Sequence, residues 1–299
     1  MQPIYIPARD GEEVPGYLTM PRNSTGARPP LVLLLHGGPS ARDVFGFDPL
    51  VQLLAARGMA VLQLNYRGST GYGRRFLKLA SGNLRGMHTD VADARRWAVG
   101  SGKFDAARIA VVGGSWGGYL ALGAATGIAD EAGEAGEAGA YAAVVGIVPL
   151  VAVGAANTAK AFRGDPIVRR YWADLYGPRV ASDLSAAAAI SPVHRLDKLE
   201  AKLLLVHGED DPRVPKEHGE AVAAAAQAKG VVGAHMTFAR EGHNIRREPN
   251  VLLMWHVVER FLCSCLALPP PPQLEARWTE GHTATVRWAA AGATWMPSD

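Results

Sequence analysis

One serine of this chain stands between glycines in a pattern suited to nucleophilic chemistry. Residues Gly113–Gly118 read Gly-Gly-Ser-Trp-Gly-Gly, between a β-branched run at 108–112 and an apolar, helix-forming run at 119–125. A sharp strand-to-helix turn strains the backbone, and glycine neighbours let strand, helix and substrate approach closely. The start of a helix also favours developing negative charge. The pattern predicts that Ser115 is a nucleophile; an ordinary glycine turn is the alternative.

Acidic residues and a histidine later in the chain could activate this serine. Asp210 and Asp211 follow a buried-strand pattern at 202–206, and His243 follows a short strand pattern at 235–239. Serine, aspartate, histidine is the chain order of hydrolases with a nucleophile at such a turn. The histidine would accept the serine proton, and the acid would fix its tautomer. These residues alone leave open which aspartate is the catalytic acid and which is a solvated turn or N-cap residue.

A second glycine turn could stabilise an oxyanion. The segment His36-Gly37-Gly38-Pro39 ends a continuous apolar run at 31–35, which predicts a strand buried on both faces of a parallel sheet. Such a turn presents backbone N–H groups at the carboxyl edge of the sheet, where an oxyanion would form. A plain tight turn is the alternative.

The elements that would position these residues alternate between strand and helix, which predicts a mainly parallel sheet with helices on both faces. Strands are expected near residues 3–8, 15–20, 30–36, 60–66, 108–114, 142–149, 202–208 and 235–239. Helices are expected near 50–57, 88–100, 116–126, 216–229 and 248–265. With the serine turn, this pattern predicts the α/β class and an α/β-hydrolase fold with a mostly parallel eight-stranded sheet, whose first two strands form an antiparallel edge.

The chain resembles the catalytic domain of the prolyl oligopeptidase family of serine peptidases, above all its acylaminoacyl-peptidase and dipeptidyl-peptidase branch. The matching segments lie in family order over about residues 1–266: Asp10-Gly11-Glu12, Gly16-Tyr17-Leu18, His36–Pro39, Asn65–Gly73, Asp90-Val91, Trp97, Gly113–Gly118, Ser191-Pro192, His207–Pro215 and Glu241–His243.

The resemblance implies roles for individual residues. The family pattern H-G-x-x-D-x-R-V-P begins at His207, and this places the acid on Asp211 rather than Asp210. The same resemblance implies that the backbone N–H groups of Trp116 and Gly38 form the oxyanion hole. Trp116 stands where the family commonly has tyrosine, and because the donor is the backbone, the change should affect pocket shape more than chemistry.

The resemblance also implies the reaction. We expect a peptidase that acts on short or acylated peptides through an acyl-enzyme and needs no cofactor. A carboxylesterase with the same triad and a non-catalytic hydrolase-fold binding protein are the alternatives. Residues 150–190 often line the acyl pocket in this fold, so Arg163–Pro166 and Tyr171-Trp172 are candidate rim residues, with ordinary packing as the alternative. Family peptidases usually carry an N-terminal β-propeller over the site; here the hydrolase pattern starts within about ten residues of Met1, so we expect no propeller.

Length and composition fit one large α/β domain, expected at residues 1–268 of the 299. A Pro-rich linker and tail, 269–299, is expected to be disordered or loosely docked, with a partner-binding or lid segment as the alternative. The acidic repeat 130–139 is interpreted as a solvated loop insertion.

Charge and cysteine usage limit the partners. The formal net charge of +3 is dispersed, so we expect no nucleic-acid binding, and no His or Cys spacing predicts a metal site. Cys263 and Cys265 are expected to be free thiols of a reducing, cytoplasmic compartment. The uncharged segment 138–159 is interrupted by glycines and a proline, so it predicts a buried strand and no membrane span. The sequence leaves self-association into a homo-oligomer open.

Overall fold

The computed structural model of this chain describes residues 1–22, 28–129, 140–154 and 166–296. Within them, one sheet of nine strands has the order β1-β2-β4-β3-β5-β6-β7-β8-β9. The strands are β1 (Gln2–Pro7), β2 (Glu13–Thr19), β3 (Leu31–Leu35), β4 (Ala60–Leu64), β5 (Ile109–Gly114), β6 (Ala143–Ile147), β7 (Lys202–Gly208), β8 (Gly233–Phe238) and β9 (Ala284–Ala289). The ladder from β4 through β3 and β5 to β8 is parallel, and the outer pairings β1–β2, β2–β4 and β8–β9 are antiparallel.

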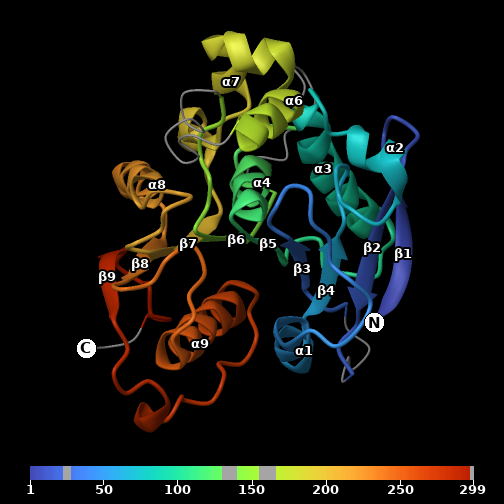
Figure 1. Cartoon of the computed structure of the whole chain (residues 1–299). Helices are drawn as coiled ribbons and strands as arrows, with labels where there is room; N and C mark the ends of the chain where they lie inside the picture. The colour runs from blue at the N-terminus through green and yellow to red at the C-terminus, as the bar shows by residue number, and fades with distance from the viewer. Residues whose placement is uncertain (23–27, 130–139, 155–165, 297–299) are drawn as a thin grey trace.

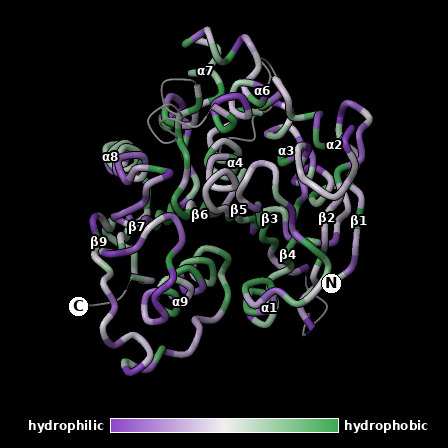
Figure 2. The backbone as a smooth tube through the Cα atoms, viewed as in Figure 1, coloured by the Kyte–Doolittle hydropathy of each residue, from purple (hydrophilic) through white to green (hydrophobic). Residues whose placement is uncertain are grey.

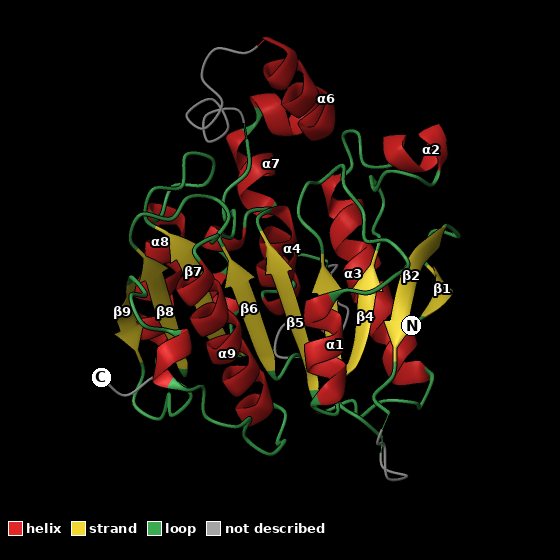
Figure 3. Ribbon diagram, turned by 60° about the horizontal axis from the view of Figure 1, so that its bottom comes forward, coloured by secondary structure: helices red, strands yellow, loops and turns green. Residues whose placement is uncertain are grey.

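Helices cover both faces of the sheet (Figure 3). The main helices are α1 (Pro49–Ala56), α3 (Leu84–Gly100), α4 (Trp116–Ala125), α8 (Glu217–Lys229) and α9 (Glu248–Cys265). Alternate residues of one strand reach opposite faces: Leu31, Leu33 and Leu35 pack in the core that includes α3, α4 and α8, whereas Val32 packs in the core that includes α1 and α9. Because the central strands are buried on both faces, they are apolar along their length, as the hydropathy colours show (Figure 2).

Three further helices lie beyond the carboxyl ends of the parallel strands: α2 (Gly73–Lys78), α6 (Pro166–Ser182) and α7 (Leu184–Ala189) (Figure 3). The helix α6 is interrupted at Gly177, whose φ of 68° and ψ of 169° are not helical. Gly177 packs directly on Gly82, since a Cβ there would lie 2.7 Å from the Gly82 Cα. The remaining described helices are short 3₁₀ turns at Pro192–His194, Leu196–Lys198 and Ala276–Trp278.

The eight strands and five helices expected from the sequence are all present, so the α/β prediction is confirmed. The structure also contains a ninth strand, β9, which the sequence pattern did not predict. Residues 284–289 pair antiparallel with β8 (Figure 1). The Trp295 ring, 3% exposed, packs 5.0 Å from the Phe261 ring of α9. The boundary at residue 268 stays a prediction, and the acidic repeat 130–139 lies outside the described residues.

The segment 138–159 behaves as expected where it is described, because residues 143–147 form β6 in the middle of the sheet. Within the described ranges, no helix combines the length and the apolar character that crossing a bilayer requires.

Candidate active site

Ser115 occupies the turn between β5 and α4. Its φ of 55° and ψ of −115° lie outside the regions that residues with a side chain prefer, and its backbone N–H donates to the Ile147 carbonyl at 2.8 Å. The adjoining glycines are sterically required. A Cβ at Gly113 would lie 2.2 Å from the Gly117 backbone, and a Cβ at Gly117 would lie 2.0 Å from the Leu35 carbonyl oxygen. The Gly-x-Ser-x-Gly spacing thus follows from contacts between β5, α4 and β3.

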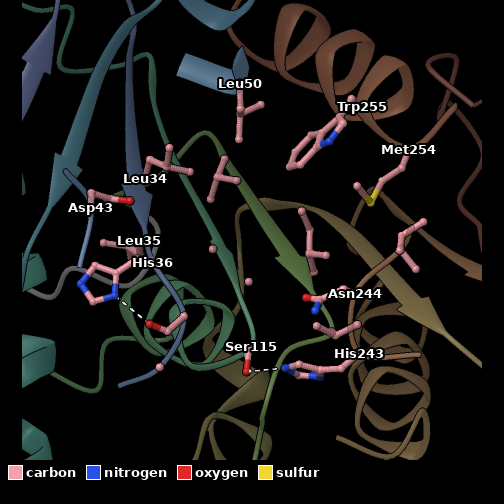
Figure 4. Close-up of a pocket in the computed structure, with 18 of the residues that line it drawn as sticks. Leu34, Leu35, His36, Asp43, Leu50, Ser115, His243, Asn244, Met254 and Trp255 are labelled. Atoms are coloured by element: carbon pink, nitrogen blue, oxygen red, sulfur yellow. Dashed lines mark hydrogen bonds between the residues drawn. The ribbon is translucent and has the colours of Figure 1, made fainter. Parts of the chain in front are cut away.

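A continuous hydrogen-bonded series runs from Ser115 to Asp211. The Ser115 Oγ lies 3.0 Å from His243 Nε2 (Figure 4), and His243 Nδ1 lies 2.8 Å from Asp211 Oδ2. The Asp211 carboxylate is fully buried, and the histidine ring is 12% exposed. With Nδ1–H directed at the carboxylate, Nε2 is left as the acceptor for the serine proton, as a general base requires.

The backbone around Asp211 keeps its carboxylate charged. Arg213 and Val214 donate their backbone N–H groups to Asp211 Oδ1 at 2.8 and 3.0 Å. Burial alone would raise the pKa of Asp211, but the hydrogen bonds from His243 and from these N–H groups outweigh it and lower the pKa below its usual value. Asp210, by contrast, is exposed, and no hydrogen bond from its side chain appears among the described contacts. The structure therefore brings Asp211, and not Asp210, to His243.

Two close contacts hold the loops of the site together. His207 is fully buried and donates from Nε2 to the Val214 carbonyl at 2.9 Å, which stabilises the loop after Asp211. A Cβ at Gly208 would lie only 2.1 Å from the Gly242 carbonyl oxygen. The acid loop and the histidine loop consequently meet at the carboxyl ends of β7 and β8.

The turn His36–Pro39 lies against the nucleophile turn. A Cβ at Gly37 would lie 3.2 Å from the Gly114 carbonyl oxygen and 3.6 Å from the Ser115 Cβ. His36 is held by a 2.9 Å hydrogen bond between its Nε2 and the Ser69 Oγ, and burial lowers its pKa to about 4, so it is neutral. Gly38 lines the same cavity as Ser115, and Trp116 follows the serine at the first position of α4, where backbone N–H groups lack helical partners.

A cavity of about 550 Å³ opens beside Ser115 (Figure 4). Much of its wall is apolar and comes from the strand ends, α1 and α9: Leu34, Leu50, Val112, Ile147, Ile245, Met254 and Trp255. Its polar lining includes Asp43, Asp48, Arg213 and Asn244. Asp43 and Asp48 are not predicted as site residues by the sequence pattern; their only signal is their position shortly after the His36–Pro39 turn.

The rim residues expected on α6 contact the turns of the site rather than the cavity. The Tyr171 hydroxyl lies 2.9 Å from the Ser40 Oγ, next to the His36–Pro39 turn. The Trp172 ring lies 5.6 Å from that of Trp116. Neither residue lines the cavity beside Ser115. Pro166 begins α6, and residues 163–165 lie outside the described part of the chain.

Comparisons with known proteins agree with this geometry. Residues 45–268 match a family model described as the prolyl oligopeptidase family. Dipeptidyl aminopeptidase BIII of Pseudoxanthomonas mexicana is 36% identical over 280 residues, which cover 88% of this chain and 38% of that protein. Dipeptidyl peptidase family member 6 of Caenorhabditis elegans is 32% identical over 247 residues, covering 79% and 31% of the two chains.

A solved structure shows the same fold. The puromycin-hydrolyzing peptidase of Mycobacterium tuberculosis superposes with a TM-score of 0.79 at 26% identity, covering 91% of this chain and 40% of that one. The chain thus spans about two fifths or less of the length of these relatives. The α/β-hydrolase fold, the family match over three quarters of the sequence and the identity to named peptidases lead to one conclusion: this chain belongs to the prolyl oligopeptidase family.

Proposed function

We propose that this chain is a serine peptidase in which Ser115 forms an acyl-enzyme with the substrate. The observation that carries the proposal is the unbroken series Ser115–His243–Asp211, with contacts of 3.0 and 2.8 Å, at a strained turn. Each member suits its role: the serine lines the cavity, the histidine accepts at Nε2, and the acid is charged and held by two backbone N–H groups.

The first half of the reaction transfers the acyl group to the serine. His243 accepts the Ser115 proton as Oγ bonds to the substrate carbonyl carbon, and the carbonyl π electrons move to its oxygen. The N–H groups of Trp116 and Gly38 stabilise this oxyanion. When the carbonyl re-forms, the C–N bond breaks and His243 gives its proton to the departing amine. Asp211 stabilises the imidazolium throughout.

The second half restores the enzyme. Water attacks the acyl carbon while His243 accepts one of its protons. The bond between the acyl carbon and the Ser115 Oγ then breaks, His243 returns the proton to Oγ, and the carboxylic acid is released. The relatives are named as dipeptidyl peptidases and as a puromycin-hydrolyzing peptidase. Together with a cavity in the size range of small-ligand sites, these names support short peptides and aminoacyl or acyl amides as substrates.

A matched set of substrates tests the proposal. The 299-residue chain is assayed with aminoacyl and acyl-peptide anilides beside p-nitrophenyl esters of the same acyl groups. We expect amide turnover that Ser115→Ala abolishes while Asp210→Asn, the control, retains most of it. Turnover of the esters alone would show an esterase instead, and amide turnover that survives in purified Ser115→Ala would refute the assignment.

A further inference from the structure

A carboxylate with no counter-ion among the described residues shares the cavity with the nucleophile. Asp43 lies four residues after Pro39, and Figure 4 shows it on the side of the cavity opposite His243, with Leu34 nearby. The side-chain atom Oδ2 of Asp43 is buried and has no hydrogen-bond partner within the described ranges. No ion pair of Asp43 occurs there either.

Hydrogen bonds with a buried side chain hold the main chain at Asp43 in place. Asn65, which is fully buried, accepts from the Asp43 backbone N–H at 2.8 Å and donates to the Asp43 carbonyl at 3.2 Å. The Asn65 amide also donates to the Tyr72 hydroxyl at 2.8 Å. This bracing holds Asp43 against the cavity and brings no positive charge to its carboxylate.

The charged neighbours of Asp43 supply no counter-ion. Asp48 repels it, and Asp48 Oδ1 is itself occupied in capping α1, 3.0 Å from the Val51 N–H. Arg42 directs its guanidinium at Gly71, where a Cβ would lie 1.5 Å from it. Arg213 also lines the cavity, but among the described residues no ion pair joins it to Asp43.

Burial, followed by repulsion from Asp48, raises the pKa of Asp43 to about 7, against a smaller lowering by a hydrogen bond with Gln63. Three other titratable groups lie around it. The His36 imidazole is neutral, the pKa of the Tyr66 phenol is raised well above its usual range, and His243 belongs to the triad. A positively charged ligand group would be the missing partner for this carboxylate, because an opposite charge favours its ionised form.

We propose that Asp43 binds a primary ammonium group of the substrate, making the cavity beside Ser115 selective for amine-bearing acyl groups. This inference rests on the proposed function, since the subsite is defined relative to attack at Ser115. The apolar wall between Leu50 and Trp255 suits the methylene part of such a group, and the partly buried carboxylate suits its charge. The ammonium has two sources, the α-amino terminus of a peptide and a lysine side chain.

Matched substrates separate these sources. In the first comparison, anilides carry lysine or norleucine at one of the two positions on the acyl side of the cleaved bond, and each position is tested in turn. In the second comparison, the anilides differ only in having a free or an acetylated amino terminus. For wild type, the charged member should have the higher kcat/KM. In Asp43→Asn this preference should fall about tenfold or more in one of the comparisons, while the uncharged member changes little. The lysine comparison or the terminus comparison then identifies the source. Unchanged preferences in both comparisons would overturn the proposal.

A neighbouring variant serves as the control. Asp48→Asn keeps an N-cap side chain on α1 and removes only the charge. It relieves the repulsion on Asp43, so the preference for the ammonium should persist or increase. A preference that is lost in Asp48→Asn and kept in Asp43→Asn would show that the wrong acid had been assigned.

Binding without turnover distinguishes this proposal from the proposed function. Calorimetry with hexylamine, and with hexanol as the uncharged control, needs no hydrolysis. Hexylamine should bind wild type and Ser115→Ala more tightly than hexanol does, and Asp43→Asn should lose this difference. If these titrations succeed while no substrate is hydrolysed, the peptidase assignment fails and the subsite stands. Equal binding of the two ligands to wild type would refute the subsite.

Discussion

Gly208 and Gly242 touch through their backbones: a Cβ on Gly208 would lie 2.1 Å from the Gly242 carbonyl oxygen. This contact joins the loop that carries Asp211 to the loop that carries His243. Because both partners are backbone atoms, neither can rotate away from an added methyl group. The 2.8 Å contact between Asp211 and His243 therefore depends on a residue without a side chain at 208.

Gly208→Ala should consequently damage both stability and activity. We expect a loss of about 2 kcal/mol or more in the free energy of unfolding, because the loops must separate. The kcat should fall further than stability alone explains, since the acid and histidine move apart. Urea unfolding and turnover of one anilide check this. Gly230→Ala is the control for adding a methyl group, because no atom of the described residues lies within 4 Å of a Cβ there, although its φ of 74° adds local strain. Wild-type turnover in Gly208→Ala would contradict the expectation.

The two adjacent aspartates should differ greatly in their importance. Asp211→Asn should lower kcat by about 10⁴, because an amide favours the wrong tautomer of His243. Asp210→Asn should change kcat by less than about threefold, since its exposed side chain does not contact the histidine. Steady-state kinetics on the same anilide measures both. A larger loss of kcat for Asp210→Asn than for Asp211→Asn would show that the catalytic acid is not Asp211.

A buried ion pair should be needed for folding. Arg67 contacts Asp90 at 2.6 Å and Asp10 at 2.8 Å, and Asp90 is fully buried. Arg67→Met leaves the Asp90 charge without its partner and should cost about 3–5 kcal/mol of unfolding free energy. Adding Asp90→Leu should recover part of that loss, which a double-mutant cycle by urea unfolding would show. Strictly additive losses would contradict a direct coupling of the two charges.

The burial of Asp43 predicts a pH-dependent stability. Its pKa is raised to about 7 in the folded chain, above the usual value of about 4 in the unfolded chain. The folded state therefore binds more protons between these values, so the contribution of Asp43 to stability falls as the pH rises from about 4 and reaches its minimum above about pH 7.

Asp43→Asn should remove this dependence. Relative to wild type, the variant should gain about 1–2 kcal/mol in unfolding free energy between pH 4 and pH 8, a figure reduced for the partial exposure of the site. Urea titrations at several pH values measure the difference. A constant difference between the two proteins at all pH values would show that Asp43 does not titrate in this range.

Much of this site could be predicted from the sequence because local sterics impose its pattern. Ser115 is recognisable because the residues at 113 and 117 must lack side chains, and β3 is recognisable because burial on both faces demands the run Leu31–Leu35. His243 follows from chain order. Asp211 was separated from Asp210 only by family resemblance, since both are equally acidic in the sequence.

Other features depend on packing that no local pattern records. β9 is mostly exposed or half-buried, so its residues lack a strand-like apolar pattern, and only the free edge of β8 makes it a strand. Asp43 is an ordinary loop residue until the folded chain places α1, the sheet and α9 around it. That no described residue supplies a counter-ion for it can be seen only in three dimensions.

The central claim, that Ser115 is the nucleophile, is tested most directly by locating a covalent adduct. The chain is treated with a fluorophosphonate, digested, and sequenced by tandem mass spectrometry alongside His243→Ala and Ser115→Ala. We expect one phosphonyl group per chain on Ser115, formed in parallel with the loss of amide turnover. We also expect a labelling rate for His243→Ala that is lower by several orders of magnitude, and no label in Ser115→Ala. Stoichiometric modification of another residue, with turnover lost and Ser115 unmodified, would contradict this claim.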